Sequence, residues 1–114
     1  MPRYLLVFNA PEPMDAFMAR STAQEIQRGM EAWTNWKAIA DKTIMFEFGG
    51  VVKGVANVGP AGTVDSASQA SNYAFAHAAT REAVVAVLQS HPHLQREGAS
   101  IDVLELLAMP GGPQ

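Results

Sequence analysis

Three side chains in the middle of the chain have the chemistry for proton transfer or ligand contact. His77 ends an alternating stretch in which Tyr73 and Phe75 point to the same side of an expected strand. Imidazole is the usual general base near neutral pH. At about 3.3 Å per residue, Tyr73 and His77 stand about 13 Å apart, so they could border one pocket without touching each other. Glu47 is the only charge in the middle of another expected strand, and a carboxyl facing the same cavity could exchange protons with a ligand.

The same residues also have a structural interpretation, which the sequence favours. His77 lies near the end of its expected strand, where it would meet water. Glu47 is typical of an edge strand that a charge protects from pairing with another chain. Glu47, Tyr73 and His77 are therefore candidates for a ligand pocket, and no residue is assigned a catalytic role.

Both tryptophans lie in residues 30–36. At about 100° per residue, Trp33 and Trp36 fall on one stripe of an expected helix, together with Met30 and Ala40. Trp33 is a further pocket candidate, because two indoles on one stripe could line a ligand site. Core packing is the favoured interpretation, since each indole can bury about 200 Å² of surface.

Neither a metal nor a cofactor is expected. The spacing of His91 and His93 could suggest a pair of metal ligands. Without a converging carboxylate, however, the two histidines supply too few ligands for a metal site. We expect them instead to cap the end of the second helix as cationic side chains. The chain has no cysteine, so thiolate metal sites and disulfides are excluded. The glycine-rich residues 54–62 lack the motif of a phosphate loop and the spacing of a dinucleotide fingerprint.

The pattern of apolar residues predicts the elements that position these side chains. A capping box at Thr22 and Glu25 begins the main helix, which ends near Asp41. Residues 3–9 are apolar on both sides, which predicts a central strand covered on both faces. The expected elements are a strand over 3–9, a helical turn over 15–20, a helix over 22–41, a strand over 43–48 that the glycine pair interrupts and that could resume at 51–52 after a bulge or turn, a wide hairpin connection over 54–62 with a short strand over 55–58, a strand over 68–78, a helix from 81 to about 90 and a strand over 100–107.

The order of the long elements is strand, helix, strand, strand, helix, strand. This order predicts an α+β fold of the ferredoxin-like βαββαβ type, with a four-stranded antiparallel sheet and two helices on one face. Residues 1–109 would form a single domain, and residues 110–114 a flexible C-terminal tail.

Composition limits the partners. The chain has 114 residues, of which 48% are hydrophobic and only 17% charged, and its net charge is −3. The scattered basic residues argue against nucleic-acid binding. The apolar run after Tyr4 is too short for a secretory signal or a membrane span, so a cytoplasmic protein without a membrane partner is expected. The low charge and the second apolar face of the first strand predict a homodimer, with two sheets packed face to face about a two-fold axis.

Four short motifs carry a family resemblance. They are Tyr4-Leu-Leu-Val-Phe8, Met30-x-x-Trp33-x-x-Trp36, Gly49-Gly50 and His91-Pro92. Together they resemble the opening strand, main helix, glycine-rich turn and second-helix end of the YCII-related, or DGPF-type, proteins. The resemblance spans nearly the whole chain and implies the dimeric α+β barrel superfamily. That superfamily includes small cofactor-free monooxygenases, dehalogenases and isomerases.

The chain also departs from this family. The YCII type carries a histidine in the main helix, whereas this register falls near Ala32 and Trp33 here. The Asp-Gly-Pro-Phe signature is absent, and Asp65-Ser-Ala-Ser68 stands near its place. The resemblance therefore implies the fold and the dimer but no catalytic residue. We expect a small cytoplasmic homodimeric YCII-like protein that holds a small apolar or aromatic organic molecule between sheet and helices. The alternative is a cofactor-independent enzyme of the monooxygenase, isomerase or dehalogenase kind.

Overall fold

The sheet of this protein is four-stranded and antiparallel throughout. The computed structural model describes residues 1–111. Its elements are β1 (Arg3–Asn9), α1 (Met14–Ala19), α2 (Ala23–Ala40), β2 (Met45–Val51), β3 (Asn57–Gly59), β4 (Gly62–Val64), β5 (Ala70–His77), α3 (Arg81–Leu88), the 3₁₀ helix η1 (Pro92–Gln95) and β6 (Ser100–Glu105). The strand order is β2-β5-β1-β6. The predicted α+β class and the central place of β1 are confirmed, and the order is compatible with a ferredoxin-like fold.

The main helix begins where the sequence predicts. The hydroxyl of Thr22 accepts the backbone N–H of Glu25 at 3.0 Å, and the Glu25 carboxylate accepts the N–H of Thr22 at 2.9 Å. This reciprocal pair satisfies two amides that a helix start would leave free. Trp36 and Ala40 are the buried residues of α2. Met30 was expected on the same stripe, but it is 63% exposed, because at 100° per residue it lies about 120° around the helix from Trp36.

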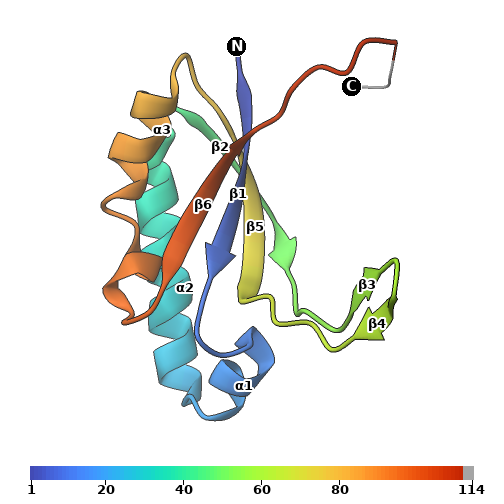
Figure 1. Cartoon of the computed structure of the whole chain (residues 1–114). Coiled ribbons are helices and arrows are strands. Elements are labelled where there is room, and N and C mark those ends of the chain that lie inside the picture. Colours follow the sequence, from blue (N-terminus) through green and yellow to red (C-terminus); the bar gives the residue numbers. More distant parts are fainter. Residues whose placement is uncertain (112–114) are drawn as a thin grey trace.

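The core lies between the sheet and two helices. Figure 1 shows α2 and α3 together on one side of the sheet. The N–H of the Trp36 indole donates to the carbonyl of Val87 at 3.2 Å, which ties α2 to α3. The small residues Ala74 and Ala76 of β5 are fully buried and let the helices approach closely. The buried cluster comprises Tyr4, Leu6, Phe8, Trp36, Ala40, Ile44, Phe46, Ala74, Ala76, Ala78, Val84 and Leu88.

Several predicted boundaries differ from the structure. The glycine pair was expected to interrupt the second strand before a resumption at 51–52. In the structure β2 begins at Met45 and runs through the pair, with a shift of register between Phe48 and Gly50. Gly49 permits this because a Cβ there would lie 2.2 Å from Cε2 of Tyr73. The last strand ends at Glu105 and α3 at Leu88, two residues earlier than expected in each case. Of the predicted flexible tail over 110–114, residues 112–114 lie outside the described residues.

The connection between β2 and β5 forms a small sheet of its own. β3 and β4 pair in an antiparallel hairpin, where the sequence predicted one short strand. Figure 1 shows this hairpin and the segment after β6 projecting from opposite ends of the sheet, on the side away from α2 and α3. The radius of gyration is 15.8 Å, whereas a compact chain of this length has about 13 Å. The projecting segments therefore give the protomer an open outline.

The helices of residues 1–111 are short or carry many polar residues. None of them combines the length and the hydrophobicity that a membrane-spanning helix requires.

Candidate functional site

A cleft of about 470 Å³ lies between α3 and the edge strand β6. Its volume is within the range of about 300–1,000 Å³ that is typical of small-molecule sites. It lies on the helix side of the sheet and is open to solvent. The lining residues are Tyr4, Arg81, Val85, Ile101, Asp102, Val103 and Glu105.

The floor of this cleft is apolar. Tyr4 is only 4% exposed, and the half-buried Ile101 and Val103 pack against the core. Tyr4 pairs with Glu105 and Leu6 with Val103 across β1 and β6, so the side chains of these residues face the helices. Burying an apolar ligand on such a floor contributes about 25 cal/mol for each Å² that is removed from water.

Charged and hydroxyl groups surround the floor. Arg81 is the first residue of α3, and its guanidinium lies 3.7 Å from the carboxylate of the adjacent Glu82, with both side chains mostly exposed. A pair this exposed contributes little, so the guanidinium is available to a ligand. Glu105 stands across from Tyr4 on the neighbouring strand. The rim therefore offers a cation and a carboxylate to polar groups of a bound molecule, and Tyr4 contributes a phenol at the floor.

No pattern in the sequence predicted this site. Arg81 begins a helix and Tyr4 belongs to an apolar run, and neither position carries a motif. One signal was present: Asp102 and Glu105 interrupt the alternation of the last strand. Only the register of β1 with β6 places Glu105 beside Tyr4.

The other face of the sheet holds three of the predicted pocket residues. Glu47 pairs with Phe75, and His77 is two residues further along β5. Diagonal neighbours of this kind have Cβ atoms roughly 7–8 Å apart or less, so carboxylate and imidazole are near each other. Tyr73 stands edge-on to Phe75, with ring centroids 5.9 Å apart. Glu47, Tyr73 and His77 thus share one face, and none of them lines the cleft.

The structural interpretation of the same residues fits their positions. β2, which carries Glu47, is an edge strand of the sheet, and His77 is the last residue of β5. The guanidinium of Arg3, which pairs with His77 across the strands, lies 5.5 Å from the centroid of the Phe75 ring. These polar groups therefore surround an apolar centre on an uncovered face.

Trp33 lies on the opposite side of the sheet from the other three candidates. Its ring centroid is 5.1 Å from that of Phe8, 4.3 Å from that of His91 and 6.3 Å from that of Phe48. The side chain is half-buried in this aromatic cluster. A single protomer therefore has no pocket that Trp33 shares with Glu47, Tyr73 and His77.

The two histidines after α3 do not act as a cationic cap, and that prediction is wrong. His91 is 1% exposed, and burial lowers its pKa to about 4, so the imidazole is neutral. Burial likewise lowers the pKa of His93, while its hydrogen bond to Asn9 opposes the shift. The His93 ring donates to the Asn9 carbonyl at 2.8 Å. The turn into η1 directs both rings into the core, away from the end of α3.

The tautomer of His91 follows from its contacts. Its Nδ1 accepts the backbone N–H of His93 at 3.0 Å, so the neutral ring carries its proton on Nε2. Among the side chains of residues 1–111, this Nε2 is the buried polar atom that lacks a hydrogen-bond partner. The ring stands at 87° to the Trp33 indole, an arrangement in which an N–H can interact with an aromatic face. The aromatic cluster therefore accommodates a neutral imidazole.

Asn9, the last residue of β1, contacts the neighbouring edge strand through both its side chain and its backbone. Its side-chain amide donates to the carboxylate of Asp102 at 2.9 Å. Its backbone pairs with Ser100 of β6. Asn9 therefore fastens the end of β1 to β6.

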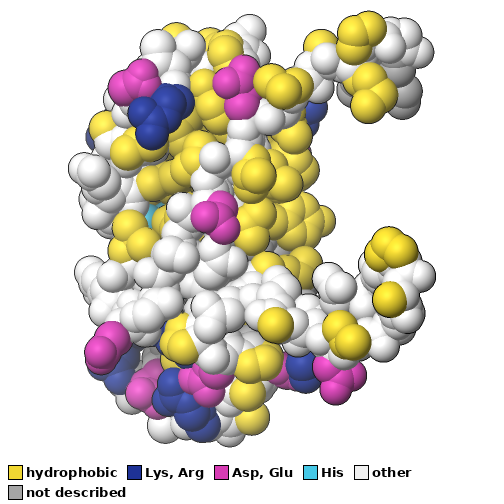
Figure 2. All heavy atoms as spheres, in the orientation of Figure 1, with side chains coloured by type: hydrophobic (Ala, Val, Ile, Leu, Met, Phe, Trp, Pro, Cys, Tyr) yellow, Lys and Arg dark blue, Asp and Glu magenta, His cyan; other side chains and the backbone are white. Residues whose placement is uncertain are grey.

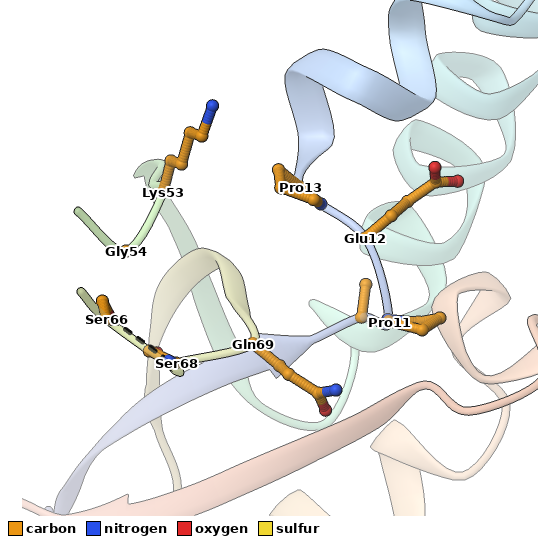
Figure 3. Close-up of a pocket in the computed structure, with 9 residues that line it drawn as sticks. Pro11, Glu12, Pro13, Lys53, Gly54, Ser66, Ser68 and Gln69 are labelled. Atoms are coloured by element: carbon orange, nitrogen blue, oxygen red, sulfur yellow. Dashed lines mark hydrogen bonds between the residues drawn. The ribbon is translucent and has the colours of Figure 1, made fainter.

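A smaller pocket of about 120 Å³ lies where the loops after β1 and β2 meet (Figure 3). Most of its polar side chains are already engaged with protein groups. Lys53 pairs with Asp15 at 2.9 Å, and Glu12 pairs with Arg20 and Arg96. The hydroxyl of Ser66 accepts the backbone N–H of Ser68 at 3.1 Å. The charges there connect the loops to α1 and η1 and make this pocket the weaker candidate.

Comparison with known proteins does not identify a family for this chain. No family model, no curated protein and no solved structure matches the chain. Within the described part of the chain, no three histidine, aspartate or glutamate side chains come together as metal ligands would.

Proposed function

We propose that this protein is a homodimeric YCII-like protein of the dimeric α+β barrel type that binds a small apolar or aromatic organic molecule. The cleft between α3 and β6 carries the proposal of binding, because it combines a suitable volume with an apolar floor. The strand order and the two helices on one face agree with a ferredoxin-like protomer. The four sequence motifs support the family assignment.

The chemistry of the cleft limits the ligand. Ile101, Val103 and Val85 favour a ring or a branched hydrocarbon, which would bury apolar surface against them. Arg81 on the rim favours one anionic group, since a guanidinium binds carboxylate and sulfonate oxygens through charge-assisted hydrogen bonds. The proposed ligand class is therefore an aromatic or alicyclic molecule with a single acidic group.

Filling the cleft should abolish this binding. We expect Val103→Trp to weaken the binding of 8-anilinonaphthalene-1-sulfonate, an aromatic anion, by tenfold or more, because the indole occupies the apolar floor. A tenfold loss corresponds to about 1.4 kcal/mol. Titration of the probe's fluorescence, excited above the absorption of tryptophan, measures the dissociation constant.

Met30→Trp is the matched control for this experiment. Met30 is 63% exposed on α2, so the same substitution there adds an indole outside the cleft. Its dissociation constant should equal that of the unmodified protein. Equal affinity of the Val103→Trp and Met30→Trp variants would rule out the cleft as the binding site.

The uncovered face of the sheet supports the homodimer. Figure 2 shows hydrophobic side chains gathered between the two projecting segments. On this face Met45 is 65% and Leu104 47% exposed. The protomer exposes 7768 Å², roughly 1,700 Å² more than a compact chain of this mass. Stable interfaces bury about 800 Å² on each partner, so the excess surface is ample for a second copy.

Light scattering at micromolar concentration should give a mass near twice the 12.2 kDa of one chain. Leu104→Asp should raise the dimer dissociation constant at least about tenfold, because it would bury an unpaired carboxylate between the sheets. The control is Leu94→Asp, on η1 behind the sheet, where the leucine is 39% exposed. A mass of one chain for the unmodified protein would contradict the dimer.

The alternative function, a cofactor-independent enzyme, has one observation in its favour. Glu47 and His77 are diagonal neighbours on the face that a second sheet would cover. Enclosure between protomers would remove water from this carboxylate and this imidazole, and a molecule bound between them could exchange protons with either group. A crystal structure of the dimer with both groups in one closed cavity would favour this alternative over simple binding.

A further inference from the structure

The connection between β2 and β5, residues 52–69, is an arm whose two ends contact the loop after β1 and α1, and whose hairpin projects away from the sheet. β3 and β4 have three residues each, and every residue in them is exposed. The arm is attached to the sheet at its base, where the N–H of Val52 donates to the carbonyl of Ser71 at 2.9 Å. An isolated two-stranded hairpin is at best marginally stable in water. This arm therefore needs contacts that a single protomer does not supply.

The composition of the arm indicates what covers it. Residues 54–64 contain no charged side chain. Val55 and Val58 are each 78% exposed, and Val64 is 65% exposed. Soluble proteins usually protect a free hairpin edge with charged residues. An uncharged hairpin with three outward valines is typical of a segment that is buried in the assembled protein.

The direction and the length of the arm indicate which molecule it contacts. Figure 1 shows the arm on the side of the sheet away from the helices, which is the side of the apolar face. Sheets that pack face to face are about 10 Å apart, and the eight residues from Val52 to Gly59, if extended, span up to about 23 Å. The arm is therefore long enough to pass the sheet of a second copy on that face.

We propose that the arm of each protomer clasps the other protomer, so that its exposed valines are buried against the second copy and stabilise the dimer. This inference rests on the proposed homodimer and adds the segment that holds it together. The molecule that the arm contacts is a second copy of this chain, because the arm is continuous with the apolar face and projects beside it. The two arms are then related by the two-fold axis and contribute equally.

The absence of cysteine from the chain makes a direct test possible. A Val58→Cys variant is labelled with benzophenone maleimide and irradiated at a concentration where the unlabelled protein is dimeric. We expect a covalent dimer on a denaturing gel. Met30→Cys, on the outer surface of α2, carries the same label as the control and should give no covalent dimer.

A second variant measures whether the contact stabilises the dimer. Val58→Asp should raise the dimer dissociation constant at least about tenfold in analytical ultracentrifugation, because the carboxylate would be desolvated against the partner. Val58 is 78% exposed in the protomer, so an unchanged circular dichroism spectrum should confirm that the fold is retained.

The outcomes separate this inference from the proposed assembly. If the unmodified protein is dimeric but the Val58 label gives no covalent dimer, the clasp is overturned and the homodimer stands. A dissociation constant unchanged by Val58→Asp overturns the stabilising role of the arm in the same way. If the unmodified protein is monomeric, the proposal of a homodimer is overturned, and so is the proposal that the arms hold it together.

Discussion

Trp36→Ala is expected to lower the free energy of unfolding by about 3–5 kcal/mol, the usual cost of emptying a buried aromatic site. Trp36 is 5% exposed, and its ring packs on Phe46 and His91, with centroids 5.0 and 4.3 Å away. The substitution also removes the hydrogen bond to the Val87 carbonyl. The Val87 carbonyl would still accept the hydroxyl of Ser90, at 3.1 Å, so most of the expected cost comes from the emptied space.

Urea denaturation at a fixed protein concentration measures this effect, since dimerisation makes apparent stability depend on concentration. Trp33→Ala is the matched control, because Trp33 is half-buried at the edge of the same cluster and has no side-chain hydrogen bond among the described residues. Its loss should be smaller than that of Trp36→Ala. A denaturation midpoint that Trp36→Ala leaves unchanged would refute the packing role of α2.

Acidification is expected to destabilise the fold before its carboxylates are protonated. The pKa of His91 is lowered by burial to about 4 from an ordinary value of 6.5. Between these two values the unfolded chain binds the proton and the folded chain does not, so stability falls as the pH falls. The stabilisation is complete above pH 6.5 and is lost progressively down to about pH 4. At 1.36 kcal/mol for each pKa unit, the loss from His91 is about 3 kcal/mol.

Other groups add to the acid sensitivity in the same direction. Burial also lowers the pKa of His93. The pKa of Glu12 is lowered chiefly by its hydrogen bond to Arg20, and that of Asp41 by its hydrogen bond to Lys37. For these carboxylates stability is lost only as the pH falls below their ordinary values, near 4. The decline between pH 6.5 and 5 is therefore expected to come from the buried histidines.

His91→Asn tests this assignment, because asparagine keeps an acceptor for the N–H of His93 and does not titrate. The free energy of unfolding, measured by urea denaturation between pH 5 and 7, should depend less steeply on pH in this variant. Val84→Ala is the control: Val84 is fully buried in the same core, so its loss lowers stability but should keep the slope. An unchanged slope in His91→Asn would show that His91 does not cause the acid sensitivity.

Local chemistry along the chain was enough to predict most of the protomer. The capping box at Thr22 and Glu25 depends on residues three apart, so the start of α2 could be predicted from neighbouring positions. The alternation of the large residues Tyr73, Phe75 and His77 with small residues predicted the strand β5. Both patterns follow from backbone periodicity alone. The number and order of the long elements could be predicted for the same reason.

The candidate sites depended on contacts between distant segments. The cleft exists because Tyr4 and Glu105 are in register across β1 and β6 and because α3 lies over them. The sequence placed Trp33 with Glu47, Tyr73 and His77 as pocket candidates, yet the sheet separates them. Which side of a sheet an aromatic residue reaches depends on how helix and sheet pack, and no local pattern contains that information.

His91 shows most clearly what the sequence determined and what only the tertiary structure decided. A proline after a histidine predicts that a helix ends there, and α3 does end just before it. The same pattern suggested a solvated, cationic cap, because an isolated helix end attracts positive charge. In the fold, the turn into η1 carries the ring between Trp33 and Trp36, where desolvation outweighs the helix dipole. Local sequence determines where the backbone turns, whereas the charge of a side chain depends on how much water the folded chain leaves around it.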